Sequence, residues 1–135
     1  MSVVIPNVGE VELLDKMLKK SDEDYTLKLF KNNLFPDAST VITDFEEANF
    51  TGYTPITLTR IEWNNATIVS GKAKAEYSSI PSWTCGATGN TVYGYWIEGT
   101  TSGTLLWTER FDSPQLLILN DVLNIPLEFV FYSAN

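Results

Sequence analysis

The chain has 135 residues, enough for one hydrophobic core and not two. Hydrophobic residues make up 44% of it and aromatic residues 13%, which excludes a disordered chain and favours β-strands. Seventeen Asp and Glu against nine Lys and Arg give a formal net charge of −8, and no basic cluster offsets it, so we expect no nucleic-acid partner.

Membrane attachment is not expected either. The longest apolar runs, such as residues 116–119, are far shorter than the roughly 20 residues that cross a bilayer as a helix. The N-terminal segment has no basic region followed by a long apolar stretch, so we also expect no secretory signal.

Residues 1–22 predict an N-terminal module that consists of an extended arm and a short α-helix. The arm, residues 3–6, is apolar. Asn7 is a good N-cap, and Glu10 follows three residues later, as in a capping box. Apolar residues at helical spacing then indicate a helix that ends by Ser21. These residues are Val11, Leu13, Leu14, Met17 and Leu18.

Residues 23–135 predict a β domain, because the period of the hydrophobic pattern changes to two from Tyr25 onward. Four segments have one apolar and one polar side, the pattern of a strand with one buried face: residues 26–31, 58–63, 69–77 and 125–131. In the third segment Ala73 and Ala75 share a face with Tyr77.

Two further segments, residues 91–97 and 103–111, are apolar on both faces. Such strands lie at the centre of a sheet, or have their second face covered by the helix or by another chain. The turn-rich residues between them, 98–103, predict a hairpin.

Turn signals divide the chain into about eight short strands. They include Asn32, Gly52, Asn64, Asn65, Gly71, Pro114 and Asn120. The predicted fold class is therefore all-β: an antiparallel, jelly-roll-like β-sandwich with an N-terminal extended arm and one short α-helix.

The sequence contains no histidine and a single cysteine, Cys85. The absence of histidine removes the commonest general base and metal ligand, together with the Ser-His and Cys-His nucleophile systems. A lone cysteine forms no internal disulfide, and no cation lies beside it in sequence to activate its thiol. We therefore expect a non-enzymatic protein with no cofactor and no metal site.

Carboxylates are the remaining candidates for chemistry. The acidic clusters at residues 22–24 and 44–47 lack the spacing of a calcium-binding EF-hand loop and suit a solvated surface. A glycosidase needs two carboxylates across a cleft. Glu109, between Trp107 and Phe111, is the best single candidate for such an acid, and a side chain that simply faces solvent explains it equally well.

Aromatic residues supply a second functional hypothesis. Trp83 stands in a predicted loop between Pro81 and Gly86, which favours exposure. An exposed aromatic side chain suits sugar stacking, as in lectin-like sandwiches. Core packing is the competing interpretation for the aromatic residues, because they carry large buried areas.

The N-terminal module has two compatible interpretations. In the first, the helix packs on the protein's own sheet and closes one end of the sandwich. In the second, the arm, residues 2–7, extends to a neighbouring subunit and adds a strand there while the helix packs locally. The predicted partner-binding residues of the arm and helix are Val3, Val4, Ile5, Pro6, Val8 and Leu13.

Five stretches, spread over nearly the whole chain, carry a resemblance to a known class of proteins. They are VIPNVGEVELL (4–14), YTLKLFKNN (25–33), FTGYTPITL (50–58), VYGYW (92–96) and LLWTERF (105–111). Together they resemble small structural proteins of tailed bacteriophages, particularly those of aquatic hosts.

This resemblance implies a virion component that is assembled in the host cytoplasm. It is either a capsid decoration (cement) protein, which binds and stabilises the shell, or a tail- or fibre-associated carbohydrate- or receptor-binding module. The implied partners are the major capsid protein or other virion proteins. Decoration proteins of this size commonly assemble as trimers, so the resemblance also implies a homotrimer.

Overall fold

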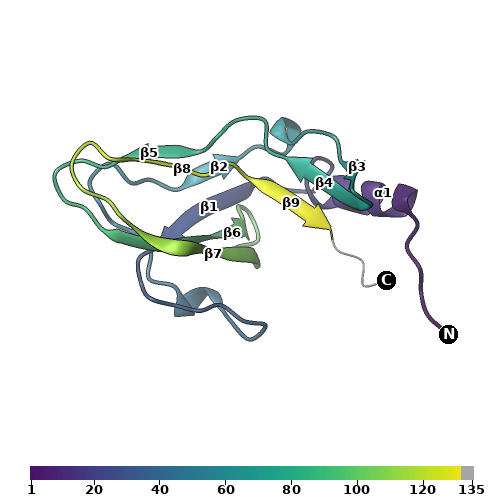
Figure 1. Ribbon diagram of the computed structural model, residues 1–135, viewed down its shortest axis with the longest axis horizontal. Coiled ribbons are helices and arrows are strands. Elements are labelled where there is room, and N and C mark those ends of the chain that lie inside the picture. Colours follow the sequence, from purple (N-terminus) through teal and green to yellow (C-terminus); the bar gives the residue numbers. More distant parts are fainter. Residues whose placement is uncertain (132–135) are drawn as a thin grey trace. The chain divides into compact units, whose positions relative to one another are not determined.

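The computed structural model describes residues 1–131. Within this range the chain is mostly β, with three antiparallel sheets and one α-helix, which confirms the all-β class and the predicted helix (Figure 1). The finer expectation of a jelly-roll-like sandwich stays a prediction. The elements form two compact units, which we call unit 1 (residues 1–22, 59–81 and 125–131) and unit 2 (residues 23–58 and 82–124).

Unit 1 contains a three-stranded antiparallel sheet with a helix against it. Its elements are α1 (Asn7–Met17), the 3-10 helix η2 (Arg60–Glu62), β3 (Thr67–Val69), β4 (Lys72–Glu76) and β9 (Glu128–Phe131). The strand order is β3-β4-β9, and Figure 1 shows α1 beside β3 and β4. Ala73 and Ala75 of β4 are buried, which confirms the predicted inner face of that strand. Of the predicted apolar face of the helix, Leu14 and Leu18 are buried, whereas Leu13 and Met17 are exposed. The N-terminal segment therefore shares a unit with these strands and does not stand apart from the β structure.

The first turn of α1 differs from the predicted capping box. Pro6 occupies the N-cap position with a φ of −62° and makes no side-chain cap, so Asn7 is the first helical residue. Glu10 therefore falls one position too late to reach back to the N-cap as a capping box requires. It is instead buried, with 2% of its surface exposed, and its Oε2 atom accepts no hydrogen bond from the residues that the structure describes.

The predicted strand at residues 58–63 is wrong. β2 ends at Leu58, and the chain continues through η2. This helical turn buries Trp63 and leaves Ile61 exposed, although a strand would place both on one face. The ring of Trp63 packs edge-to-face on Tyr77, with 5.2 Å between the ring centroids. Tertiary packing of a large aromatic side chain thus outweighs the local period of two.

Unit 2 contains a four-stranded and a two-stranded sheet, both antiparallel. Its elements are β1 (Tyr25–Phe30), the 3-10 helix η1 (Ile42–Asp44), β2 (Ile56–Leu58), β5 (Ser82–Thr84), β6 (Thr91–Gly99), β7 (Leu105–Leu116) and β8 (Val122–Asn124). The strand orders are β2-β1-β6-β7 and β5-β8. β6 is thus a central strand, as its two apolar faces predicted, and it forms the predicted hairpin with β7.

β7 is an edge strand, although its two apolar faces allowed a central position. It runs through Pro114, where the sequence predicted a turn. Proline lacks the backbone N–H group that would donate to a neighbouring strand. It is therefore tolerated on an edge strand, which has no neighbour on one side. Leu106 of β7 stays exposed. The sequence also allowed the second face of this strand to be covered by another chain, and that alternative stays a prediction.

The long segment between β1 and β2 covers one face of the four-stranded sheet. Phe45 stacks on Trp96 at 4.6 Å and contacts Phe30 at 5.1 Å, both measured between ring centroids. Arg110 of β7 binds the same segment. Its guanidinium lies 3.9 Å from the ring centre of Phe35 and donates a hydrogen bond to Leu34 O at 2.8 Å. Aromatic and cation–π packing thus closes this face.

Glu23 fastens the start of β1 to the β6–β7 hairpin. Its Oε1 atom accepts hydrogen bonds from the N–H groups of Ser102 at 3.0 Å and Thr101 at 2.9 Å. The bonds from the N–H and hydroxyl groups of Ser102, followed by the bond from Thr101, lower the pKa of this carboxyl below its ordinary value of 4.5.

Glu23→Gln is expected to lower the melting temperature at neutral pH and to lose this effect in acid. The pKa is lower in the folded state than in the unfolded state, so the carboxylate stabilises the fold fully above about pH 4.5. This contribution disappears as the pH falls through the lowered pKa. Thermal denaturation of the wild type and the variant, from neutral pH down to roughly pH 3, measures the difference. A difference that stays constant over this range contradicts the assigned role.

Candidate protein-binding surfaces and a polar pocket

The predicted partner-binding residues of the N-terminal module form an apolar segment that we call the arm surface: Val3, Val4, Ile5, Pro6, Val8 and Leu13. Val3 is 88% exposed and Val4 66% exposed, and only Ile5 is half-buried. Residues 1–6 lie outside every helix and strand described over residues 1–131, and Figure 1 shows them running away from α1. Clustered exposed apolar side chains mark interaction surfaces. Binding itself stays a prediction.

The arm starts from an anchored helix. Asp15 Oδ1 accepts a hydrogen bond from the N–H group of Ala66 at 2.7 Å, which ties α1 to the segment before β3. A Cβ atom added to Gly9 would lie 3.3 Å from Ile5 Cγ2, so the glycine lets Ile5 settle against the first helical turn. The valines before Ile5 are left to face outward.

Unit 2 carries a second apolar surface, which the sequence did not identify as an interaction site. Four large aliphatic side chains lie exposed where β7 leads into β8, and we call them the tip surface: Leu116, Ile118, Leu119 and Val122. Their exposed fractions lie between 55% and 69%, whereas Leu117 among them is buried. The apolar run was visible in the sequence, but a run does not reveal which of its members face outward.

The tip surface stands on a hydrogen-bonded turn. Asn120 adopts a left-handed φ of 71°, a conformation that asparagine tolerates better than most residues. Asp121 Oδ2 accepts from the Ile118 N–H group at 2.9 Å. The Cys85 N–H group donates to Asp121 O at 2.7 Å, and the Asn120 N–H group donates to Cys85 O at 2.8 Å. A surface held in this way loses little conformational entropy on binding.

The prediction that Trp83 is exposed is wrong. Its side chain is 4% exposed, and its Nε1 atom donates to Thr54 O at 2.7 Å. Its ring stacks against Tyr53 with 6.3 Å between centroids. The segment is a strand, β5, paired with β8, and therefore has one buried face where the sequence predicted a loop. Cys85 follows and is also buried.

Among the described residues, the ionisable groups with the most altered pKa values are two tyrosines of unit 2, the buried Tyr95 and the half-buried Tyr53. Burial, followed by a hydrogen bond to Glu47, raises the pKa of Tyr53, whose hydroxyl donates to Glu47 Oε2 at 2.6 Å. Burial, followed by the nearby charge of Glu109, raises the pKa of Tyr95. Glu109, the best sequence candidate for a catalytic acid, is exposed on the edge strand β7. Both tyrosines therefore stay protonated and serve the core.

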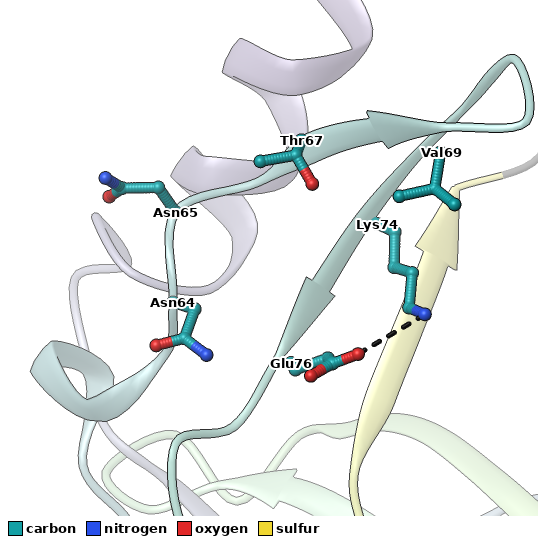
Figure 2. Close-up of a pocket in the computed structure, with 6 residues that line it drawn as sticks. All are labelled: Asn64, Asn65, Thr67, Val69, Lys74 and Glu76. Atoms are coloured by element: carbon teal, nitrogen blue, oxygen red, sulfur yellow. Dashed lines mark ion pairs between the residues drawn. The ribbon is translucent and has the colours of Figure 1, made fainter.

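Unit 1 holds an open polar pocket of about 250 Å³ on one face of its sheet (Figure 2). Its lining consists of Asn64, Asn65, Thr67, Val69, Lys74 and Glu76. Thr67 and Lys74 lie directly opposite each other in β3 and β4, so they share the face away from the buried alanines. Figure 2 shows the two asparagines on the segment that leads into β3. The sequence indicated these two residues only as a turn.

Lys74 is the central charge of this pocket. Its Nζ atom lies 3.0 Å from Glu128 Oε2 and 3.3 Å from Glu76 Oε1, the second of which Figure 2 marks as an ion pair. Hydrogen bonds to Glu128, followed by those to Glu76, raise the pKa of Lys74, so the group stays a charged donor. Glu76 and Glu128 face each other across β4 and β9, and the lysine offsets their repulsion.

The described residues contain no metal-binding cluster and no membrane-spanning helix. Among residues 1–131, no group of three or more cysteine, histidine, aspartate or glutamate side chains is arranged to hold a metal ion. None of the helices in that range combines the length and apolar character needed to cross a membrane.

Comparisons with protein-family models, with characterised proteins and with solved structures give no match. The function is therefore inferred from the surfaces of the chain itself.

Proposed function

We propose that this chain is a non-enzymatic virion structural protein, and specifically a capsid decoration protein that bridges neighbouring subunits of a phage shell. The observation that carries the proposal is the arm surface, in which exposed apolar side chains extend from an anchored helix. The phage setting comes from the resemblance of the sequence to small structural proteins of tailed bacteriophages. In this proposal the fold is a jelly-roll-like sandwich, the protein forms a trimer in the virion, and its partners are the major capsid protein or other virion proteins.

The arm would bind by adding a strand to the edge of a partner's sheet. Main-chain groups of an extended segment supply hydrogen bonds in this mode, and alternate side chains enter pockets of the partner. Burial of a fully exposed valine contributes about 1.5–3 kcal/mol. Val3 and Val4 are therefore sufficient to make the arm a substantial part of the binding free energy.

The tip surface supports the bridging mechanism. It lies in unit 2, whereas the arm surface lies in unit 1. In the proposed mechanism each of the two apolar surfaces binds a different partner subunit. Cross-linking of neighbouring subunits in this way stabilises a shell without any chemical step. The alternative, a tail- or fibre-associated carbohydrate- or receptor-binding module, has lost Trp83 as its contact residue because that side chain is buried.

Val3→Asp is expected to lower incorporation of the protein into particles by at least about tenfold, because a charge replaces an apolar group that becomes buried in the complex. Val41→Asp is the matched control, since Val41 is 54% exposed in unit 2 and belongs to neither surface. Both variants are expected to melt at the wild-type temperature. Incorporation is measured from the band intensity in purified particles. Equal incorporation of the two variants overturns the role of the arm.

Cryo-electron microscopy of the purified particle locates the protein. Under the proposal, density for the β-rich subunit occupies the three-fold or quasi-three-fold positions of the capsid, and the arm reaches an adjacent subunit. Density confined to the neck or tail contradicts the decoration role and favours the tail-associated alternative.

A further inference from the structure

The asparagines of the polar pocket in unit 1 are not used by the fold. Asn64 and Asn65 are exposed, and no hydrogen bond joins their side-chain amides to another residue in the described range 1–131. By contrast, the amides of Asn32, Asn33 and Asn90 hold loop segments of unit 2 through hydrogen bonds of 2.7–2.9 Å. The Asn64 amide therefore keeps its donors and acceptor available for a ligand, whereas Figure 2 shows the Asn65 amide pointing away from Lys74 and Glu76.

The backbone that carries these amides is fixed at several points. The Asn64 N–H group donates to Glu76 O at 2.9 Å, and the Ala66 N–H group donates to Asp15 Oδ1 at 2.7 Å. Thr67 then enters the sheet opposite Lys74. A ligand would meet a site whose backbone is already ordered, which lowers the entropic cost of binding.

Lys74 and its two carboxylates offer both donors and acceptors. An ammonium group has three N–H donors, and its contacts with Glu76 and Glu128 use two of them. The remaining N–H group and the unused carboxylate lone pairs are left for a ligand. One lysine and two glutamates sum to a local charge of −1 on a chain of net charge −8, which disfavours phosphates, nucleotides and acidic sugars.

A second pocket adjoins the first and shares Glu76 with it. Its volume is about 340 Å³, and its lining consists of Glu76, Tyr77, Ser78, Ile80, Pro126, Leu127 and Glu128. These residues add apolar surface to a hydrogen-bonding groove. Small-molecule pockets typically measure about 300–1,000 Å³. The second pocket lies at the lower end of this range and the first, at about 250 Å³, just below it, so neither has room for more than one small ring.

We infer that these adjoining pockets form a binding site for a neutral oligosaccharide, with one sugar ring in each pocket. Each sugar hydroxyl both donates and accepts, which matches the mixture of amide, ammonium and carboxylate groups around the first ring. The C–H faces of the rings meet Val69 in the first pocket, and Ile80 and Pro126 in the second. The inference concerns a ligand site in unit 1 and does not rest on the proposed virion role.

The test is a nuclear magnetic resonance titration of the full ¹⁵N-labelled chain with the neutral disaccharides maltose, cellobiose, lactose and diacetylchitobiose at millimolar concentration. At least one of them is expected to give saturable shifts in the side-chain amide of Asn64 and in the backbone of Thr67 and Lys74. Asn64→Ala is expected to weaken that binding by about tenfold or more, because it removes hydrogen bonds to the ring.

Asn124→Ala is the matched control, since Asn124 is an exposed asparagine of β8, outside both pockets. It is expected to bind like the wild type, and thermal melting establishes that both variants are folded. Three results overturn the inference: no saturable shift with any of the four sugars, binding that persists unchanged in Asn64→Ala, or competition for the site by inorganic phosphate.

Discussion

Trp83→Ala is expected to lower the free energy of unfolding by about 3–5 kcal/mol, the usual cost of removing a buried aromatic side chain. The indole is 4% exposed, stacks on Tyr53, and donates to Thr54 O at 2.7 Å. The substitution therefore leaves a cavity and also removes the indole donor of the Thr54 carbonyl oxygen. Urea denaturation followed by circular dichroism measures the loss.

Trp83→Phe separates the two contributions. It keeps most of the ring volume and removes the Nε1 donor, so we expect an intermediate loss of about 1–3 kcal/mol. A loss below about 1 kcal/mol for Trp83→Ala is the usual result for a surface residue and would contradict the buried position. A loss of stability in both variants would also exclude Trp83 as a sugar-stacking residue. Replacing an exposed aromatic side chain that stacks on a sugar lowers ligand binding and leaves stability unchanged.

The double variant Val3→Asp, Leu119→Asp is expected to bind particles about 10²–10⁴-fold more weakly than the wild type. If the arm surface and the tip surface contact two partner subunits at once, their binding is multivalent, and the second contact forms at high effective concentration. Weakening both contacts removes this advantage together with the apolar burial of each surface. Binding to particles that lack the protein, measured over a range of protein concentrations, gives the apparent affinity.

The single variant Leu119→Asp tests the tip surface by itself. Leu119 is exposed on a turn that is held through the backbone and the Asp121 side chain, so the change is expected to leave the melting temperature unaltered. Wild-type particle binding of this variant would remove the tip surface from the interface. The protein would then be attached only through its arm, and the bridging mechanism would be lost.

Several local features of the structure were predictable from short-range patterns. The inner face of β4 follows from the alternation of Ala73 and Ala75 with lysines, and the buried helix face follows from the spacing of Leu14 and Leu18. The β6–β7 hairpin follows from the glycine-rich turn, in which Gly103 has a φ of 69°.

Other features depended on partners distant in the sequence. The capping box was expected at Asn7, but Pro6 moved the helix start by one residue and placed Glu10 in the interior. Residues 58–63 have a strand pattern, but the burial of Trp63 selects a 3-10 turn. The tip surface was not predictable either, because local sequence does not show which side chains of the apolar run at residues 116–119 face outward.

The sequence by itself determined the β-rich class, the helix and the five longer strands, because backbone periodicity and turn chemistry act over a few neighbouring residues. These strands are β1, β4, β6, β7 and β9. Only the tertiary structure decided the burial of Glu10 and Trp83, and which side chains meet in a pocket. The buried indole of Trp83 donates its hydrogen bond to the carbonyl oxygen of Thr54, which lies 29 residues earlier in the sequence. The polar pocket exists because antiparallel pairing places Lys74 between Glu76 of its own strand and Glu128 of β9. Burial and convergence are set by contacts between distant segments, and those contacts form only when the whole chain is folded.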